Sequence, residues 1–120
     1  MRNNMVAEKS ITFSIRLIKI YKILAQERKE FILSKQLLRS GTAIGALIRE
    51  AEHGQSKADF LNKMNIALKE ANETDYWLLL LYKGEYLTEK EYNSINADCS
   101  ELLIILIKIV KTTKENISRT

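Results

Sequence analysis

The 120-residue chain contains no proline and only four glycines. A β-rich fold of this length needs many turns, which usually contain these residues, so their scarcity favours long, uninterrupted helices. Cys99 is the only cysteine, which excludes an intrachain disulfide framework and a cysteine-based zinc site and fits a reducing compartment. Its place between Ile95 and Leu102, on an apolar helical stripe, predicts a buried and unreactive thiol.

Long hydrophobic runs are also missing. Residues 1–13 lack the apolar stretch of a secretory signal. Apolar runs such as residues 77–82 and 102–107 are far shorter than the roughly 20 residues that a membrane span requires. We therefore expect a soluble, cytoplasmic protein without a membrane partner.

Apolar residues recur at helical spacing in four segments, over about residues 10–26, 34–53, 56–83 and 88–116. The third and fourth segments begin with capping-box patterns, Ser56-Lys-Ala-Asp and Thr88-Glu-Lys-Glu. Short connections between consecutive helices favour antiparallel neighbours. The sequence thus predicts an all-α fold, an antiparallel up-down-up-down four-helix bundle that forms a single domain over residues 1–120.

Three of the predicted helices carry a second apolar face that a monomeric bundle of this size cannot bury. Large exposed apolar patches usually mark interaction sites, so this pattern predicts a homo-oligomer, whereas isolated surface isoleucines would need no explanation. Glu70 and Glu73 fall on the same face as Trp77, which favours charge pairing at a subunit contact over a solvated face. The predicted subunit-contact residues are Ile11, Ile15, Ile18, Ile66, Glu70, Glu73, Trp77, Leu80, Ile104 and Ile107.

Charge is distributed unevenly along the chain, although its net value is only +4. Residues 1–49 contain ten basic and three acidic side chains. Residues 50–101 contain five basic and eleven acidic side chains, and residues 102–120 contain four basic and one acidic side chain. Two basic rows step by three, Arg16, Lys19, Lys22 and Lys108, Lys111, Lys114. Because the first and last helices of an up-down bundle are neighbours, we expect these rows to lie side by side and to contact RNA or DNA phosphates. Ordinary lysines that keep an apolar helix soluble are the alternative interpretation.

Catalytic and metal-binding patterns are incomplete. Glu50-Ala-Glu-His53 is half of a di-iron signature, but its required second Glu-x-x-His pair cannot exist in a chain with one histidine. His53 beside Gly54 is better explained as a helix C-terminus. Gly41 and Gly45 lie within a helical pattern without the Lys-Ser or Lys-Thr of a phosphate loop, and so predict close approach of a neighbouring helix. We expect no enzymatic activity, no metal and no cofactor.

The middle of the chain resembles a known family. Residues 36–42 read Gln-Leu-Leu-Arg-Ser-Gly-Thr and are followed, in register, by Ile44-Gly-Ala, Glu50-Ala, Gln55-Ser-Lys, Asp59-Phe, Ala67-Leu-Lys-Glu-Ala, Glu73-Thr and Tyr76-Trp. This segment resembles the four-helix-bundle proteins encoded by intervening sequences of bacterial large-subunit ribosomal RNA genes.

The resemblance implies an antiparallel four-helix bundle that assembles into a ring-shaped homopentamer. It also implies kinship in fold with the accessory variability proteins of diversity-generating retroelements, which bind nucleic acid and a reverse transcriptase through a basic surface. It implies no established activity. Two functions follow as expectations: an oligomeric bundle that binds RNA or DNA without sequence preference, or a scaffold whose partner is another protein.

Overall fold

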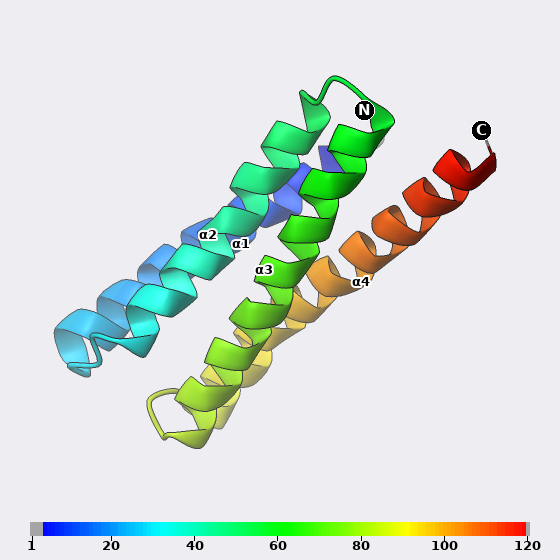
Figure 1. Ribbon diagram of the computed structural model, residues 1–120. Coiled ribbons are helices and arrows are strands. Elements are labelled where there is room, and N and C mark those ends of the chain that lie inside the picture. The colour runs from blue at the N-terminus through cyan, green and yellow to red at the C-terminus, as the bar shows by residue number, and fades with distance from the viewer. Residues whose placement is uncertain (1–3, 120) are drawn as a thin grey trace.

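The computed structural model describes residues 4–119, which form an antiparallel four-helix bundle (Figure 1). Helix α1 (Asn4–Lys22) continues into a π-helical turn, η1 (Ile23–Glu27), and is followed by α2 (Leu33–Glu52), α3 (Lys57–Lys83) and α4 (Glu89–Arg119). The chain runs up and down in order, so both ends of the described chain lie at the same end of a 52 × 21 × 21 Å molecule. No strand occurs within residues 4–119, and the predicted fold class is confirmed.

Helix α1 begins at Asn4, six residues before the predicted start at Ser10. Val6 continues the buried stripe of Phe13 and Leu17 toward the N-terminus, so packing holds this extra turn in the helix. Ser10 is itself buried, and its hydroxyl donates to the carbonyl oxygen of Ala7 at 2.7 Å instead of capping the helix. The other three predicted helices agree with the structure to within three residues at each end.

Two helices begin as the capping patterns predict. The Ser56 hydroxyl accepts a hydrogen bond from the Asp59 amide at 3.0 Å, at the start of α3. The amides of Thr88 and Glu91 donate to each other's side chains at 2.8 and 3.1 Å, a complete reciprocal box at the start of α4.

Helix α2 begins differently, with a buried carboxylate. Glu30 lies before the helix and accepts hydrogen bonds from the backbone amides of Ile32, Leu33 and Ser34 at 3.2, 3.0 and 2.6 Å. These bonds satisfy amides that have no partner within the helix and place a negative charge at its positive end. The sequence pattern gave no sign of this cap, because Glu is not a preferred N-cap residue and stands outside the helical period.

The core runs the length of the bundle and includes Leu17, Leu37, Ile44, Leu78 and Leu106, each fully buried. Cys99 is also fully buried, as predicted, with its thiol directed toward the Ala71 carbonyl oxygen at 3.7 Å. Burial raises the pKa of this thiol to about 12, with a smaller contribution from Asp75. The reactive thiolate form is therefore strongly disfavoured near neutral pH.

Glycines allow α1 and α2 to approach closely, as their spacing predicts. A methyl group at Gly41 would overlap the Leu17 side chain, and one at Gly45 would lie 3.0 Å from the Ser10 hydroxyl oxygen. On the other side of α2, the buried Thr74 hydroxyl of α3 donates to the Ser40 hydroxyl at 2.8 Å. Helix α2 is thus packed tightly on both neighbours, by small residues and one internal polar pair.

Candidate functional site

The contact between α1 and α4 differs from the other helix contacts. Helix α1 packs far less extensively on α4 than on α2. Side-chain ion pairs span the seam: Lys9 to Glu101 at 3.0 Å, Arg16 to Asp98 at 2.6 Å, and Arg28 to Glu91 at 2.8 Å. The Arg16 guanidinium also donates to the Ser94 hydroxyl at 2.9 Å. Ion pairs therefore make up much of the contact between α1 and α4, whereas the other neighbouring helices contact each other mainly through apolar packing.

Arg28 makes the strongest of these contacts. Two of its guanidinium nitrogens donate to the two oxygens of Glu91, each at 2.8 Å, and one also donates to the Tyr86 carbonyl oxygen. Hydrogen bonding to Arg28 and to the Thr88 amide lowers the pKa of Glu91 to about 2. The sequence alone does not indicate this pair, because Arg28 lies in a polar break between helices and no nearby residue points to its distant partner.

Two clefts open along this seam, on either side of the Arg16 bridge. The first, of about 300 Å³, has an apolar floor that includes Ile20, Ile23 and Leu87, and a rim that contains Arg28 and Lys90. The second, of about 340 Å³, lies near the N-terminal end of α1 and is bordered by Met5, Glu8, Lys9, Thr12, Asp98, Glu101 and Leu102. The seam thus presents one cleft with a mainly basic rim and one with a mainly acidic rim.

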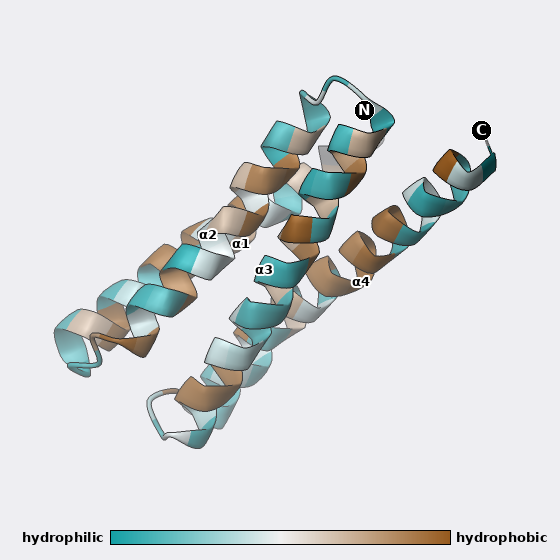
Figure 2. Cartoon of the chain, in the orientation of Figure 1, coloured by the Kyte–Doolittle hydropathy of each residue, from teal (hydrophilic) through white to brown (hydrophobic). Residues whose placement is uncertain are grey.

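The predicted second apolar face is exposed on α1 and α4. Ile11, Ile15 and Ile18 on α1 and Ile104 and Ile107 on α4 retain between 42% and 55% of their accessible surface. Figure 2 shows hydrophobic residues on successive turns of the C-terminal half of α4. These two helices therefore carry apolar residues that the bundle itself does not cover.

On α3 the predicted face lies along the boundary with α2. Ile66, Trp77 and Leu80 are half-buried there. Glu70 and Glu73 both pair with Arg39 of α2, the first at 3.3 Å, and the Trp77 ring nitrogen donates to Glu73 at 3.2 Å. Hydrogen bonding to Glu73 raises the pKa of Arg39. The charge pairing predicted at a subunit contact thus occurs within the chain, and the role of these residues between subunits stays a prediction.

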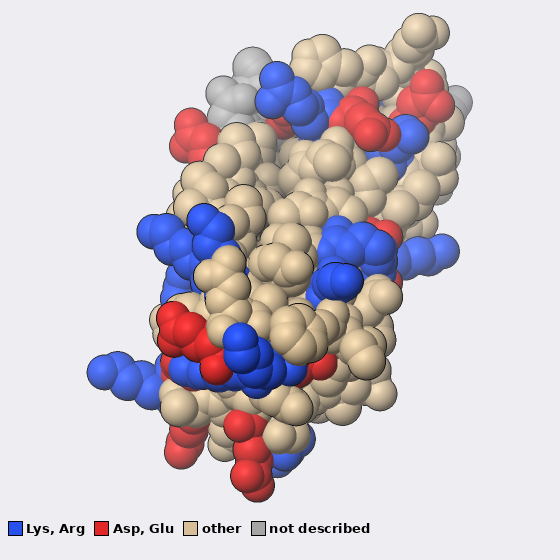
Figure 3. Space-filling view, turned by 90° about the vertical axis from the view of Figure 1, so that its left-hand side faces the viewer, with Lys and Arg blue, Asp and Glu red and all other residues tan. Residues whose placement is uncertain are grey.

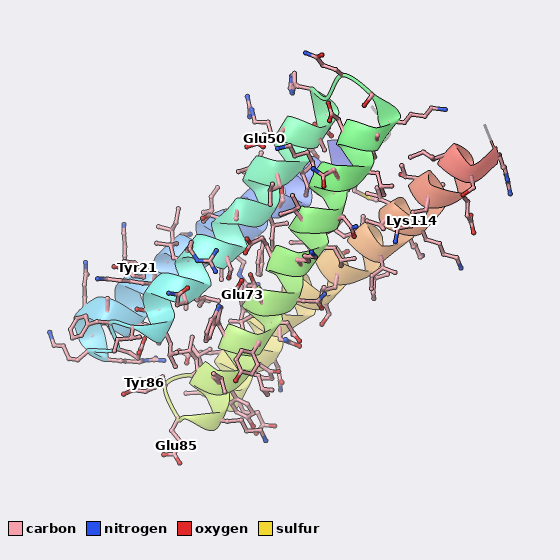
Figure 4. The ribbon with its side chains drawn as sticks, viewed as in Figure 1. Tyr21, Glu50, Glu73, Glu85, Tyr86 and Lys114 are labelled. Atoms are coloured by element: carbon pink, nitrogen blue, oxygen red, sulfur yellow. The ribbon has the colours of Figure 1, made fainter. Side chains whose placement is uncertain are left out.

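The structure does not bring the two basic rows together. Arg16 is engaged by Asp98 and Ser94, which leaves Lys19 and Lys22 as exposed members of the first row. Helix α4 extends beyond the start of α1, so Lys108 lies about 20 Å along α4 from Ser94, the level of the first row. In Figure 4, Tyr21, which precedes Lys22, and Lys114 lie toward opposite ends of the bundle.

The expectation that the two rows lie side by side is therefore corrected. Adjacent helices do not imply adjacent rows, because antiparallel helices bring the start of one beside the end of the other and α4 is the longer helix. Lys19, Lys22, Lys108, Lys111 and Lys114 are nevertheless exposed, and none forms an ion pair within residues 4–119. On the side of the molecule shown in Figure 3, basic and acidic side chains are interspersed and form no continuous basic surface.

His53 ends α2, as predicted, and its Nδ1 atom lies 2.9 Å from the Arg49 carbonyl oxygen. Within the described chain, no three or more His, Cys, Asp or Glu side chains are grouped as a metal site would require. None of the helices in the described range is both long enough and apolar enough to cross a membrane.

The fold and its surfaces define a class: an all-α four-helix bundle with uncovered apolar faces and exposed lysine side chains. Residues 2–108 match the family described as 23S rRNA-intervening sequence protein, and the chain belongs to this family. The family resemblance seen in the sequence is confirmed. Kinship with the retroelement proteins stays a prediction.

A solved structure agrees with this assignment. The chain is similar to a protein of unknown function from the S23 ribosomal protein family of Bacteroides thetaiotaomicron, with a TM-score of 0.90 and 58% sequence identity. The similarity covers 92% of this chain and 99% of that one. No curated protein matches the chain. Neither the family description nor the name of the solved structure includes a catalytic activity.

Proposed function

We propose that the protein is a non-enzymatic scaffold that assembles with copies of itself. The observation that carries this proposal is the exposure of Ile11, Ile15 and Ile18 on α1 and of Ile104 and Ile107 on α4. Five exposed isoleucines on two helices of a chain of this size are more than scattered surface residues, and their burial between copies would be favourable. The number of copies that we propose, five in a ring, comes from the family resemblance alone.

Light scattering of the purified protein tests this proposal. We expect a mass of five chains of 13.9 kDa each at micromolar concentration. The double variants Ile11→Ser/Ile15→Ser and Ile104→Ser/Ile107→Ser should shift the mass toward the monomer while leaving the helical circular dichroism signal intact, because these side chains contribute little to the core. A monomeric native protein would contradict the proposal.

Binding of RNA or DNA phosphates is a second candidate function. It is supported by Lys19, Lys22, Lys108, Lys111 and Lys114, which are exposed and have no acidic partner within the described chain. Arg16 is withdrawn from this set because Asp98 and Ser94 occupy its guanidinium. A lysine ammonium recognises phosphate as a point charge, so binding would show little sequence preference.

Salt titration of binding to a duplex and to a single strand tests the second function. The slope of log affinity against log salt should be about 0.9 per phosphate neutralised on a duplex and about 0.7 on a single strand. The variant Lys108→Gln/Lys111→Gln/Lys114→Gln should weaken binding and flatten this slope, and so should Lys19→Gln/Lys22→Gln. Absence of binding at low salt would instead favour a scaffold whose partner is another protein.

A further inference from the structure

We infer that a second copy of this chain docks its α4 surface into the acidic cleft between α1 and α4. The docking surface, which we term the α4 ridge, consists of Ile104, Ile107, Lys108 and Lys111. The receiving surface, termed the acidic cleft, is lined by three carboxylates and one lysine together with three uncharged residues: Met5, Glu8, Lys9, Thr12, Asp98, Glu101 and Leu102. This inference rests on the proposed self-assembly and specifies which surfaces meet.

The α4 ridge combines an apolar centre with uncompensated positive charge. Ile104 and Ile107 are each more than half exposed. Lys108 and Lys111 lie next to them, are exposed, and form no ion pair within residues 4–119. A helix that presents isoleucines and lysines together fits a groove with an apolar floor and an acidic rim.

The acidic cleft combines apolar surface with an acidic rim. Met5, which is 58% exposed, and Leu102 supply apolar surface, and three carboxylates border the opening of about 340 Å³. Asp98 is paired with Arg16 and Glu101 with Lys9, whereas Glu8 has no cationic partner in the described chain. The Lys9–Glu101 pair is itself solvent-exposed, with 36% and 52% of the two side chains accessible, so an incoming lysine can join it. The cleft therefore has an unpaired negative charge where the ridge has unpaired positive charges.

Position and charge favour this pairing over the other combinations. The Lys9–Glu101 pair marks the level of the cleft, and the α4 ridge begins one turn further along the same helix. Copies placed side by side with parallel axes can thus join ridge and cleft with little displacement along the axis. Such a contact joins two different surfaces of the same chain, and repeating it can close a ring. In the other cleft Arg28 is paired with Glu91 and Arg16 with Asp98, so Lys90 is the one charge of its lining without an ion pair in the described chain, and it repels a lysine-bearing ridge. The exposed isoleucines of α1 fit the acidic cleft less well, because the exposed lysines of that helix, Lys19 and Lys22, lie toward the end of the molecule opposite the cleft.

Charge-reversing substitutions on each surface, first separately and then together in one protein, test the inference. The ridge variant Lys108→Glu/Lys111→Glu and the cleft variant Glu8→Lys/Glu101→Lys should each raise the concentration at half-assembly by about tenfold or more, because like charges then face each other. The quadruple variant restores opposite charges and should return the assembly toward the native mass. Light scattering over a dilution series measures all four proteins, and circular dichroism with urea unfolding checks that each remains folded.

The matched control is Lys35→Glu/Lys69→Glu, which reverses two lysines on α2 and α3 that are exposed and have no ion pair within residues 4–119. It should leave the mass unchanged. The inference is overturned if the native protein assembles and the ridge variant assembles equally well, or if the quadruple variant fails to recover; self-assembly then stands and uses other surfaces. A monomeric native protein overturns both proposals. Lys108 and Lys111 are covered in this assembly, so any nucleic acid that is bound as well would contact the remaining lysines, and Lys19→Gln/Lys22→Gln should weaken that binding without changing the mass.

Discussion

Helix α1 contacts its two neighbours, α2 and α4, in opposite ways. Gly41 brings α2 against α1, and the Ser40–Thr74 hydroxyl pair joins α2 to α3 inside the core. The seam between α4 and α1 instead consists of exposed ion pairs with an open cleft on either side. Dense apolar packing dominates stability, whereas exposed ion pairs contribute little. The comparison teaches that the contacts of α2, the packed side, stabilise the fold more than the α1–α4 seam does. The seam, the open side, remains available for contacts with partners.

The largest effect is expected from a substitution in the packed side. Ile44→Ala removes a fully buried side chain of α2, and we expect it to lower the free energy of unfolding by about 2–5 kcal/mol. Urea unfolding at one protein concentration measures this, since assembly makes stability depend on concentration. Ile15→Ala on the exposed face of α1 is the control and should change the stability of the folded chain by much less. Equal losses for both variants would contradict the division between the two sides.

A second prediction concerns the polar pair within the packed side. Thr74→Val leaves the buried Ser40 hydroxyl with only a long contact to the Leu37 carbonyl oxygen, at 3.5 Å, and we expect a loss of about 1 kcal/mol in the free energy of unfolding. The double variant Ser40→Ala/Thr74→Val removes both hydroxyls and should recover part of this loss, because no weakly bonded hydroxyl is then left buried. A double-mutant cycle by urea unfolding measures the coupling. Strict additivity of the two single effects would show that the pair does not act as a unit.

The two sides also differ in how much the sequence predicts. Helical spacing and capping patterns locate α2, α3 and α4 and the core residue Cys99, because these features depend on residues close together in the chain. The capping of α2 by Glu30 and the pairing of Arg28 with Glu91 were not predictable, since each needs the path of the chain outside a helix or the register of two distant helices. The expected alignment of the basic rows failed for the same reason: spacing identifies each row but does not give the level of one helix relative to another.

The third prediction concerns the open side, where a fall in pH weakens the Arg28–Glu91 contact. Hydrogen bonds to Arg28 and to the Thr88 amide lower the pKa of Glu91 from its ordinary value of 4.5 to about 2. A carboxyl group whose pKa is lower in the folded state stabilises the fold above its unfolded value and loses that contribution as pH falls from about 4.5 through about 2. Because the Glu91 side chain is 37% exposed, solvent screening limits the contribution to about 1 kcal/mol.

Glu91→Gln tests this contribution while retaining an oxygen for the Thr88 amide. At pH 7 it should be less stable than the native protein by about 1 kcal/mol, and the difference should disappear as the pH approaches 2. Unfolding curves measured at intervals between pH 7 and pH 2 give this difference directly. A difference that stays constant across that range would mean that the charge of Glu91 plays no part.

The smallest effect concerns the turns that connect the helices at the end opposite the chain termini. Lys29, between η1 and α2, and Glu85, between α3 and α4, both have positive φ angles, 58° and 71°. Residues with a Cβ atom are strained there, whereas glycine is not, although glycine also gains freedom in the unfolded chain. Lys29→Gly and Glu85→Gly should therefore each stabilise the fold by about 0.5 kcal/mol, while Lys35→Gly within α2 should destabilise it by about 1 kcal/mol. Because Lys29 leads into the tightly packed α2 and Glu85 into α4, similar gains at both sites, measured by urea unfolding, would show that turn strain is independent of how firmly the following helix is packed.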